Sequence, residues 1–138
     1  MKMILKLFYL FVFGGIVYAL IELLFRGNTH WTMVLAGGLC FILIGGINEI
    51  FTYEMAITSQ MLISAVIITV VEFFTGLLVN CCLGWNVWDY SDMPYNLHGQ
   101  VCLIFLCAWF FLSLAAILLD DFLRYKLFGE EKPHYKIL

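Results

Sequence analysis

The sequence predicts an all-α polytopic membrane protein, a bundle of four transmembrane helices with both termini in the cytoplasm. Of its 138 residues, 64% are hydrophobic and only 12% are charged, and the mean hydropathy is +0.98. These values lie well outside the range of soluble globular proteins. Four apolar stretches reach the roughly 20 residues that a helix needs to cross a bilayer, at about residues 4–25, 31–51, 61–83 and 99–119. No linker or low-complexity tract separates them, so we expect one domain over residues 1–138.

The basic residues predict the orientation of the chain. Lys2 and Lys6 precede the first span, the remaining lysines and Arg124 follow the fourth, and only Arg26 lies in a loop. Because basic residues gather on the cytoplasmic side, we expect both termini on the cytoplasmic side of the cell membrane. We also expect an outer loop at residues 84–98 and a cytoplasmic tail at residues 120–138. A cleaved signal sequence is the competing interpretation, but the apolar run is long and no clear cleavage site follows it.

The first span carries polar residues at helical spacing. Gly14, Tyr18, Glu22 and Arg26 are each four apart and therefore share one face of a helix. Glu22 and Arg26 have the spacing of an intrahelical ion pair, which would neutralise the carboxylate. A structural pair near the outer interface explains these two residues as well as a binding site does.

The second span is rich in glycine. Gly38 and Gly45 lie on one side together with Asn48, and small residues let helix backbones approach closely in lipid. Glu49, at the inner end, is explained by contact with the inner headgroup region.

Glu72 lies near the middle of the third span and shares a face with Gly76 and Asn80. A central acidic residue costs roughly 2.5–3.5 kcal/mol to insert and usually faces the bundle interior, where it finds a partner and marks a pathway or site. A buried hydrogen-bonding network and a functional site are both open interpretations of Glu72.

The outer loop and the fourth span complete the chain. Residues 84–98 are dense in aromatic and turn-forming residues, which is typical of an interfacial cap. Asp89 faces the same side as Arg26 and permits an ion pair between loops. Further polar residues at this end are His30, His98 and Gln100. Their spacing does not match that of metal ligands. The pattern of residues 120–128 predicts the end of a helix at the membrane interface, which stops at Gly129.

The five cysteines lie within or at the ends of apolar spans and include no C-x-x-C pair. We expect most of them to be inert small hydrophobic residues. A disulfide between Cys102 and either Cys81 or Cys82 is an open alternative that depends on geometry.

Taken in order, the motifs resemble a bacterial family labelled putative ABC-transporter type IV membrane protein, over about residues 14–121. They are Gly14-Gly15-x-x-Tyr18-x-x-x-Glu22-x-x-x-Arg26-Gly27-x-Thr29-His30-Trp31, Gly37-Gly38, Asn48-Glu49, Glu72-Phe73-x-x-Gly76 with Asn80, and Trp88-Asp89-Tyr90-Ser91-x-x-Pro94-x-Asn96-x-x-Gly99-Gln100. The segment from Val71 to Gly76, followed by Trp88 to Ser91, is also similar to a family of uncharacterised vertebrate multispan transmembrane proteins. The resemblance implies a small multispan membrane protein.

The leading functional hypothesis is a small transporter or permease-like subunit in which a buried carboxylate binds a proton, a cation or a cationic substrate. The expected binding residues are Glu72, Asn80, Tyr18, Glu22 and Gln100, and the expected outer polar cluster is Arg26, His30, Asp89 and His98. A non-transporting assembly, regulatory or interaction subunit is the alternative. A membrane-embedded enzyme using Glu72, Asp89 and His98 is less favoured, because no hydrolase or metalloprotease motif is present.

The expected partners follow from size and composition. The chain contacts the lipid bilayer, and four helices enclose little interior, so we expect a homo-oligomer. No Walker-type phosphate loop is present, so any ATP-driven transport would need a separate membrane or ATPase partner. We expect no cofactor, no metal and, without a basic cluster, no nucleic-acid partner.

Overall fold

The computed structural model describes residues 2–51 and 55–137 and is all-helical apart from one small hairpin. The helices are α1 (Lys2–Arg26), α2 (Trp31–Phe51), α3 (Ile57–Gly76), which continues as the π-helix η1 (Leu77–Cys82), and α4 (Leu103–Phe128). The strands β1 (Asn96–Leu97) and β2 (Val101–Cys102) pair antiparallel before α4. Four helices of the described chain are long and apolar enough to span a membrane, which confirms the predicted fold class. The side on which the termini lie stays a prediction, and the words inner and outer are used in the sense of that predicted orientation.

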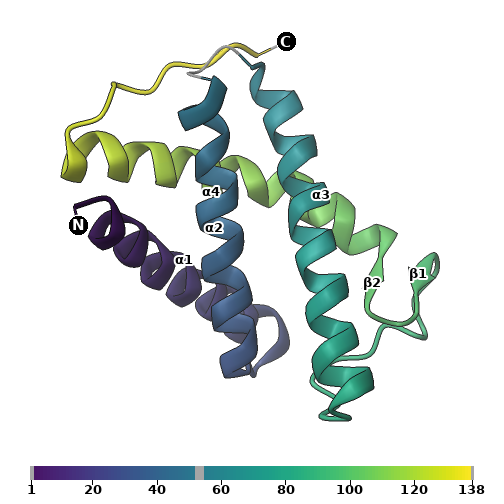
Figure 1. Cartoon of the computed structure of the whole chain (residues 1–138). Coiled ribbons are helices and arrows are strands. Elements are labelled where there is room, and N and C mark those ends of the chain that lie inside the picture. Colours follow the sequence, from purple (N-terminus) through teal and green to yellow (C-terminus); the bar gives the residue numbers. More distant parts are fainter. Residues whose placement is uncertain (1, 52–54, 138) are drawn as a thin grey trace.

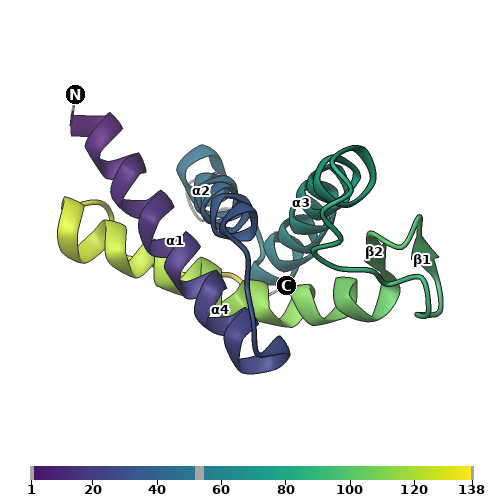
Figure 2. The ribbon, with the colours of Figure 1, turned by 90° about the horizontal axis from the view of Figure 1, so that it is seen from below.

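The helices form two crossed pairs, α1 with α2 and α3 with α4. Figure 1 shows α2 and α3 running next to each other, with α4 crossing both of them, and Figure 2 shows α1 passing over α4. α1 packs mainly on α2, and α4 packs on α3 and α2. The start of α1 lies close to the chain just after α4, where Lys6 Nζ is 2.8 Å from Glu130 Oε2.

Glycines set the close contact between α1 and α2. A Cβ atom on Gly15 would lie 2.7 Å from the carbonyl oxygen of Val34, and one on Gly38 would lie 2.6 Å from that of Phe11. Only residues without a side chain allow the two backbones to approach this closely. The packing role expected for the glycines is therefore present in the structure.

The fourth helix differs from its predicted bounds at both ends. It begins at Leu103 rather than at residue 99, because residues 96–102 form the hairpin and Gly99 turns it with a φ of +70°. It continues past residue 119 to Phe128, since Asp120, Asp121 and Arg124 are buried against the inner end of the molecule rather than left in a tail. Gly129 ends the helix in a left-handed conformation, as expected from the sequence.

The chain after α4 folds back over the inner ends of α2 and α3. The backbone N–H of Ile57, the first residue of α3, donates to the carbonyl oxygen of Lys136 over 2.6 Å. The third helix accordingly begins at Ile57 rather than at residue 61. This return segment closes the end of the molecule opposite to the hairpin (Figure 1).

An apolar cluster at the centre separates two polar regions. Its buried members are Cys40, Ile44, Ile57, Met61, Ile68 and Ile117. The outward faces of the helices carry large exposed apolar side chains, such as Leu24, Phe25 and Phe111, as lipid contact requires. The buried charged side chains therefore lie at two levels inside the molecule, while the uncharged Gln60, Ser64 and Ser113 are buried in the same stretches of α3 and α4 as the apolar cluster.

Candidate functional site

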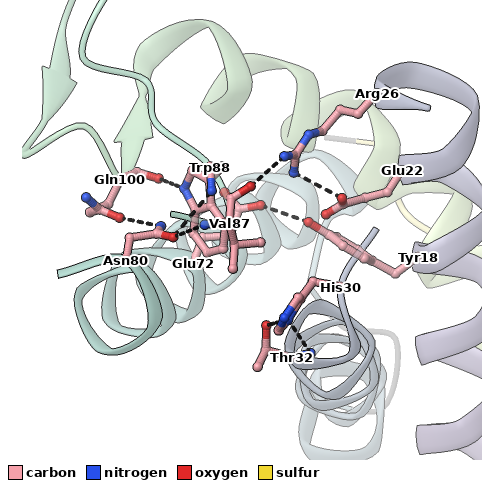
Figure 3. Close-up of polar contacts among 10 residues, drawn as sticks. All are labelled: Tyr18, Glu22, Arg26, His30, Thr32, Glu72, Asn80, Val87, Trp88 and Gln100. Carbon is pink, nitrogen blue, oxygen red and sulfur yellow. Dashed lines mark hydrogen bonds and ion pairs between the residues drawn. The ribbon is translucent and has the colours of Figure 1, made fainter. Parts of the chain in front are cut away.

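Glu72 is buried where α1, α3 and α4 meet. Its side chain is only 5% exposed. The hydroxyl of Tyr18 donates to Glu72 Oε1 over 3.2 Å, and the indole N–H of Trp109 donates to Oε2 over 3.3 Å. Figure 3 shows Tyr18 of α1 reaching across to the carboxyl group. The carboxyl group thus takes one hydrogen bond on each oxygen, and both donors are neutral.

Local packing fixes the two donors. The rings of Tyr18 and Trp109 stack with their centroids 5.7 Å apart and their planes at 22°. Gly37 of α2 makes room for Tyr18, because a Cβ there would lie 2.5 Å from the Tyr18 Cβ. Both rings are therefore held in place behind the carboxyl group of Glu72.

Two cavities meet at the stacked rings. They have volumes of about 100 and 110 Å³, lie between α1 and α4, and share Tyr18, Ile21, Trp109 and Leu112 as lining residues. One extends along α2 to Ile44 and Ser113, and the other extends to Glu22, Arg26 and Tyr90. Their walls are mostly apolar. Glu72 lines neither cavity, but the rings of its two hydrogen-bond donors line both.

Arg26 connects α1 to the outer loop. Its NH1 donates to Glu22 Oε2 over 3.1 Å, and its NH2 donates to the carbonyl oxygen of Val87 over 2.9 Å (Figure 3). The predicted intrahelical pair with Glu22 is confirmed. Within residues 2–51 and 55–137, however, the structure forms no ion pair between Arg26 and Asp89, because Val87 takes the second nitrogen of the guanidinium.

Asp89 is satisfied locally instead. Its Oδ1 accepts hydrogen bonds from Ser91 N at 2.9 Å and Ser91 Oγ at 2.5 Å. These two bonds hold the pKa of the Asp89 carboxyl below its ordinary value. Tyr90 packs inward, and burial raises the pKa of its hydroxyl. Asp89 therefore stands on the surface, apart from buried Glu72.

Asn80 and Gln100 form a cap over the outer end of α3. Asn80 Nδ2 donates to Gln100 Oε1 over 2.8 Å, and Asn80 Oδ1 accepts from the backbone N–H groups of Val87 and Trp88 at 2.6 and 3.3 Å. The indole N–H of Trp88 donates to the carbonyl oxygen of Gln100 over 2.8 Å (Figure 3). Neither Asn80 nor Gln100 lines the two cavities. Their contacts hold the outer loop, and their part in ligand binding stays a prediction.

Of the two outer histidines, His98 contacts this cap, because its carbonyl oxygen accepts from Gln100 Nε2 at 2.7 Å. His30 Nδ1 lies 2.7 Å from Thr32 Oγ1 and accepts from Thr32 N over 3.3 Å, so it caps the start of α2. The His98 ring lies 6.3 Å from the ring of Phe73. In the part of the chain that the structure describes, no three acidic, histidine or cysteine side chains converge as metal ligands. All five cysteines are free.

Sequence reasoning missed a second buried polar region at the inner end. Asp121 Oδ2 accepts from Asn48 Nδ2 at 2.6 Å and from the hydroxyl of Tyr135 at 2.8 Å. Arg124 Nε lies 2.9 Å from Asp120 Oδ2, and Arg124 NH1 lies 3.0 Å from Glu49 Oε1. The i, i+4 spacing of Asp120 and Arg124 was the available signal. The charges of residues 120–128 also fit the polar end of an interfacial helix, which is what the sequence predicts.

Comparison with known proteins gives one match. A family model described as putative ABC-transporter type IV matches residues 2–130 of the chain. No curated protein and no solved structure matches it.

Proposed function

The chain belongs to the putative ABC-transporter type IV family, and from this premise we propose that it is a small transporter or permease-like subunit of a cell membrane. In this proposal Glu72 binds a proton, a cation or a cationic group of the substrate. The four membrane-spanning helices place the carboxyl group in lipid-surrounded protein, where a functional role is the default hypothesis for an ionisable residue.

The observation that carries the proposal is the pairing of Glu72 with neutral donors alone. Among the described residues, no basic side chain pairs with it; Arg26 is used by Glu22 and Val87. A lysine or arginine partner would keep the carboxylate ionised. A tyrosine hydroxyl can donate to the ionised carboxylate or accept from the protonated acid. The pocket therefore accommodates both charge states, as proton or cation exchange requires.

In this proposal the substrate approaches Glu72 through the cavities between α1 and α4. Their walls are apolar, and a charge that enters them leaves water and interacts more strongly with a carboxylate. Rotation of the Tyr18 or Trp109 ring would open either cavity to Glu72, since both rings border both cavities. Glu22 and Arg26 lie at the far end of one cavity and would contact a polar group of the substrate there.

The test is ligand-dependent thermal stability of the detergent-purified protein, with wild type and Glu72→Gln compared in parallel. The panel contains alkali cations, amines, lipids and small metabolites. We expect at least one compound to stabilise the wild type and not Glu72→Gln, because a ligand that binds only the native state raises its apparent stability. The matched control is Glu131→Gln, which changes an exposed carboxylate and should keep the ligand-dependent stabilisation.

Transport itself is then measured in proteoliposomes with the compound that the panel identifies. Wild type should carry it with a pH-dependent rate, and Glu72→Gln should lose both the flux and its pH dependence. Unchanged flux in Glu72→Gln would exclude an exchange mechanism at this residue.

The small cavities also favour assembly. A single copy encloses only about 100 and 110 Å³ in these two cavities, which is below the usual size of a ligand pocket. A pathway would therefore form between copies in a closed homo-oligomer, alone or with a separate ATPase partner. The mass of the purified protein–detergent complex tests the oligomer.

A non-transporting assembly or regulatory subunit is the second candidate, and the outer hairpin favours it. Tyr95, just before β1, is 83% exposed, and Leu97, within β1, is 54% exposed. An apolar surface outside the bundle would suit a partner protein. If cross-linking in membranes gives a defined complex that Tyr95→Ser abolishes, while Glu72→Gln leaves it intact, this function is preferred.

A further inference from the structure

The start of α1 and the end of α4 form a groove at the inner end of the molecule. Figures 1 and 2 both place these two helix ends on the same side of the molecule. The groove has a volume of about 760 Å³, which is within the usual range of ligand pockets. Apolar side chains and lysines line it, among them Lys2, Leu5, Lys6, Tyr9, Leu127 and Phe128. The proposed function at Glu72 does not use any of these residues.

Apolar side chains from both helices form the walls of the groove. The rings of Tyr9 and Phe128 meet edge to face with their centroids 5.9 Å apart, which joins α1 to α4 about two turns in from Lys2. Leu5 is 62% exposed and Leu127 is 55% exposed, so the groove is open to the surroundings of the bundle. Both helices are long and apolar enough to span a membrane. The groove therefore opens toward lipid, and an acyl chain can enter it without crossing water.

Two lysines lie on the α1 side of the groove. Lys2 and Lys6 are one turn apart on α1, and both line the groove. Lys2 is exposed and belongs to no ion pair within residues 2–51 and 55–137. Lys6 Nζ lies 2.8 Å from Glu130 Oε2, but a lysine ammonium has three donors and can bind a second acceptor. The groove thus offers ammonium donors to an anion.

The acidic side chain that lines the groove is already engaged. Glu130 pairs with Lys6 and also hydrogen-bonds Glu49 of α2. A cationic ligand at this place would have to compete with Lys6 for the carboxylate and would also lie near Lys2. The groove therefore favours an anionic group over a cationic one.

Lysines beside apolar walls at the end of two membrane-spanning helices match the chemistry of a phospholipid. Phosphate oxygens accept strong hydrogen bonds from ammonium groups, while acyl chains cover apolar side chains. Basic pockets between transmembrane helices bind anionic lipid headgroups on the cytoplasmic side, which is where the predicted orientation places this groove. A zwitterionic lipid fits less well, because its own cationic group would lie beside the lysines.

We propose that this groove binds one anionic phospholipid, with the phosphate at Lys2 and Lys6 and an acyl chain along Tyr9, Leu127 and Phe128. Phosphatidylglycerol, with a single negative charge and no amine, is the simplest lipid of this class. The bound lipid adds a contact between α1 and α4 at the place where the Tyr9–Phe128 contact and the Lys6–Glu130 pair already connect these parts of the chain. It therefore stabilises the inner end of the bundle.

The experiment compares thermal unfolding of the full-length chain in neutral detergent with phosphatidylglycerol or phosphatidylcholine of the same acyl chains added at equal mole fraction. We expect the midpoint with phosphatidylglycerol to exceed that with phosphatidylcholine by about 5 °C. Glycerol 3-phosphate, which has the phosphate without the chains, should give no shift. Glu72→Gln should retain the full preference, so a failure of this proposal and a failure of the proposed function give different results.

Native mass spectrometry of the same samples counts the bound lipid and gives its affinity. About one phosphatidylglycerol per chain is expected. Lys2→Gln should weaken its binding about fivefold, because a basic residue near the membrane surface attracts anionic lipid. The matched control is Lys126→Gln, which changes an exposed lysine of the last turn of α4 that does not line the groove. It should leave the affinity unchanged.

The apolar wall has its own pair of variants. Leu127→Ser should also weaken binding, whereas Leu24→Ser, at an 84% exposed position near the other end of α1, should not. All four changed side chains are exposed, so folding does not depend on them. Equal stabilisation by the two lipids would overturn the proposal, and so would a shift produced by glycerol 3-phosphate alone. An unchanged affinity for phosphatidylglycerol in Lys2→Gln would overturn it as well.

Discussion

At the residue scale, the environment of Glu72 is defined by two ring side chains. Tyr18 and Trp109 donate one hydrogen bond to each carboxyl oxygen and stack on each other. The rings line both cavities and also hold the carboxyl group in place. Removing a single hydrogen-bonding atom tests the second role without removing the ring.

Tyr18→Phe should reduce the free energy of unfolding by about 1–2 kcal/mol, because it leaves a buried carboxyl oxygen without its donor. Reversible unfolding in mixed micelles measures the change. Tyr95→Phe is the control, since the side chain of Tyr95 is 83% exposed and its loss of a hydroxyl should change nothing. If Tyr18→Phe is as stable as wild type, the hydroxyl does not hold Glu72.

The Asp89–Ser91 contact makes the outer loop sensitive to acid. Because the folded pKa of Asp89 is lowered by its hydrogen bonds from Ser91, the contact stabilises the loop above the ordinary aspartate range. That contribution is lost as the pH falls through the lowered pKa. An NMR titration of the Asp89 carboxyl carbon should show the depressed pKa, and Ser91→Ala should raise it part of the way to the ordinary value, because the backbone N–H of residue 91 still donates. An unshifted pKa in the wild type would contradict the geometry.

At the element scale, α4 carries the contacts that join the two polar regions. Trp109 meets Glu72 near the outer half, and Asp120, Asp121 and Arg124 meet α2 at the inner end. Between them Ile117 packs in the apolar cluster. The approach of α4 to α2 depends on Gly45, whose missing side chain leaves room for Asp120.

Two adjacent glycines offer a matched test of this approach. Gly45→Ala should destabilise the protein by about 1–3 kcal/mol, since the added methyl group overlaps the Asp120 carboxyl. Gly46 has no atom within 4 Å of an added Cβ, so Gly46→Ala should be neutral or stabilise by up to about 1 kcal/mol. Thermal unfolding of both variants decides the point. Equal effects at the two positions would show that α4 does not lie against Gly45.

At the scale of the whole molecule, the described chain has a polar region at each end and an apolar cluster between them. The outer region contains Glu72 and the cap, and the inner region contains the network around Asp120. A protein that carries an ion or a charged group across a membrane needs a barrier of this kind between its two sides.

The predicted orientation is tested with single cysteines placed in a cysteine-free background. Asp92→Cys in the outer loop should react with a membrane-impermeant maleimide in intact cells. Lys2→Cys and Lys132→Cys should react only after the membrane is permeabilised, since the basic residues flanking the first and last spans favour the cytoplasm. The reverse pattern would place both termini outside, and labelling of only one terminus would contradict an even number of spans.

The sequence by itself determined the membrane class, the four spans and the family, because these depend on composition, apolar length and ordered motifs. It also identified Glu72 and the pairing of Glu22 with Arg26, since mid-span depth and i, i+4 spacing are local properties of the chain. Only the tertiary structure decided which side chains meet. It joined Glu72 to Tyr18 and Trp109, turned Asn80 and Gln100 into a cap, and buried Asp120 against Gly45. These contacts depend on how the helices cross and rotate, and the largely apolar faces that lipid surrounds leave that arrangement undetermined until the helices pack.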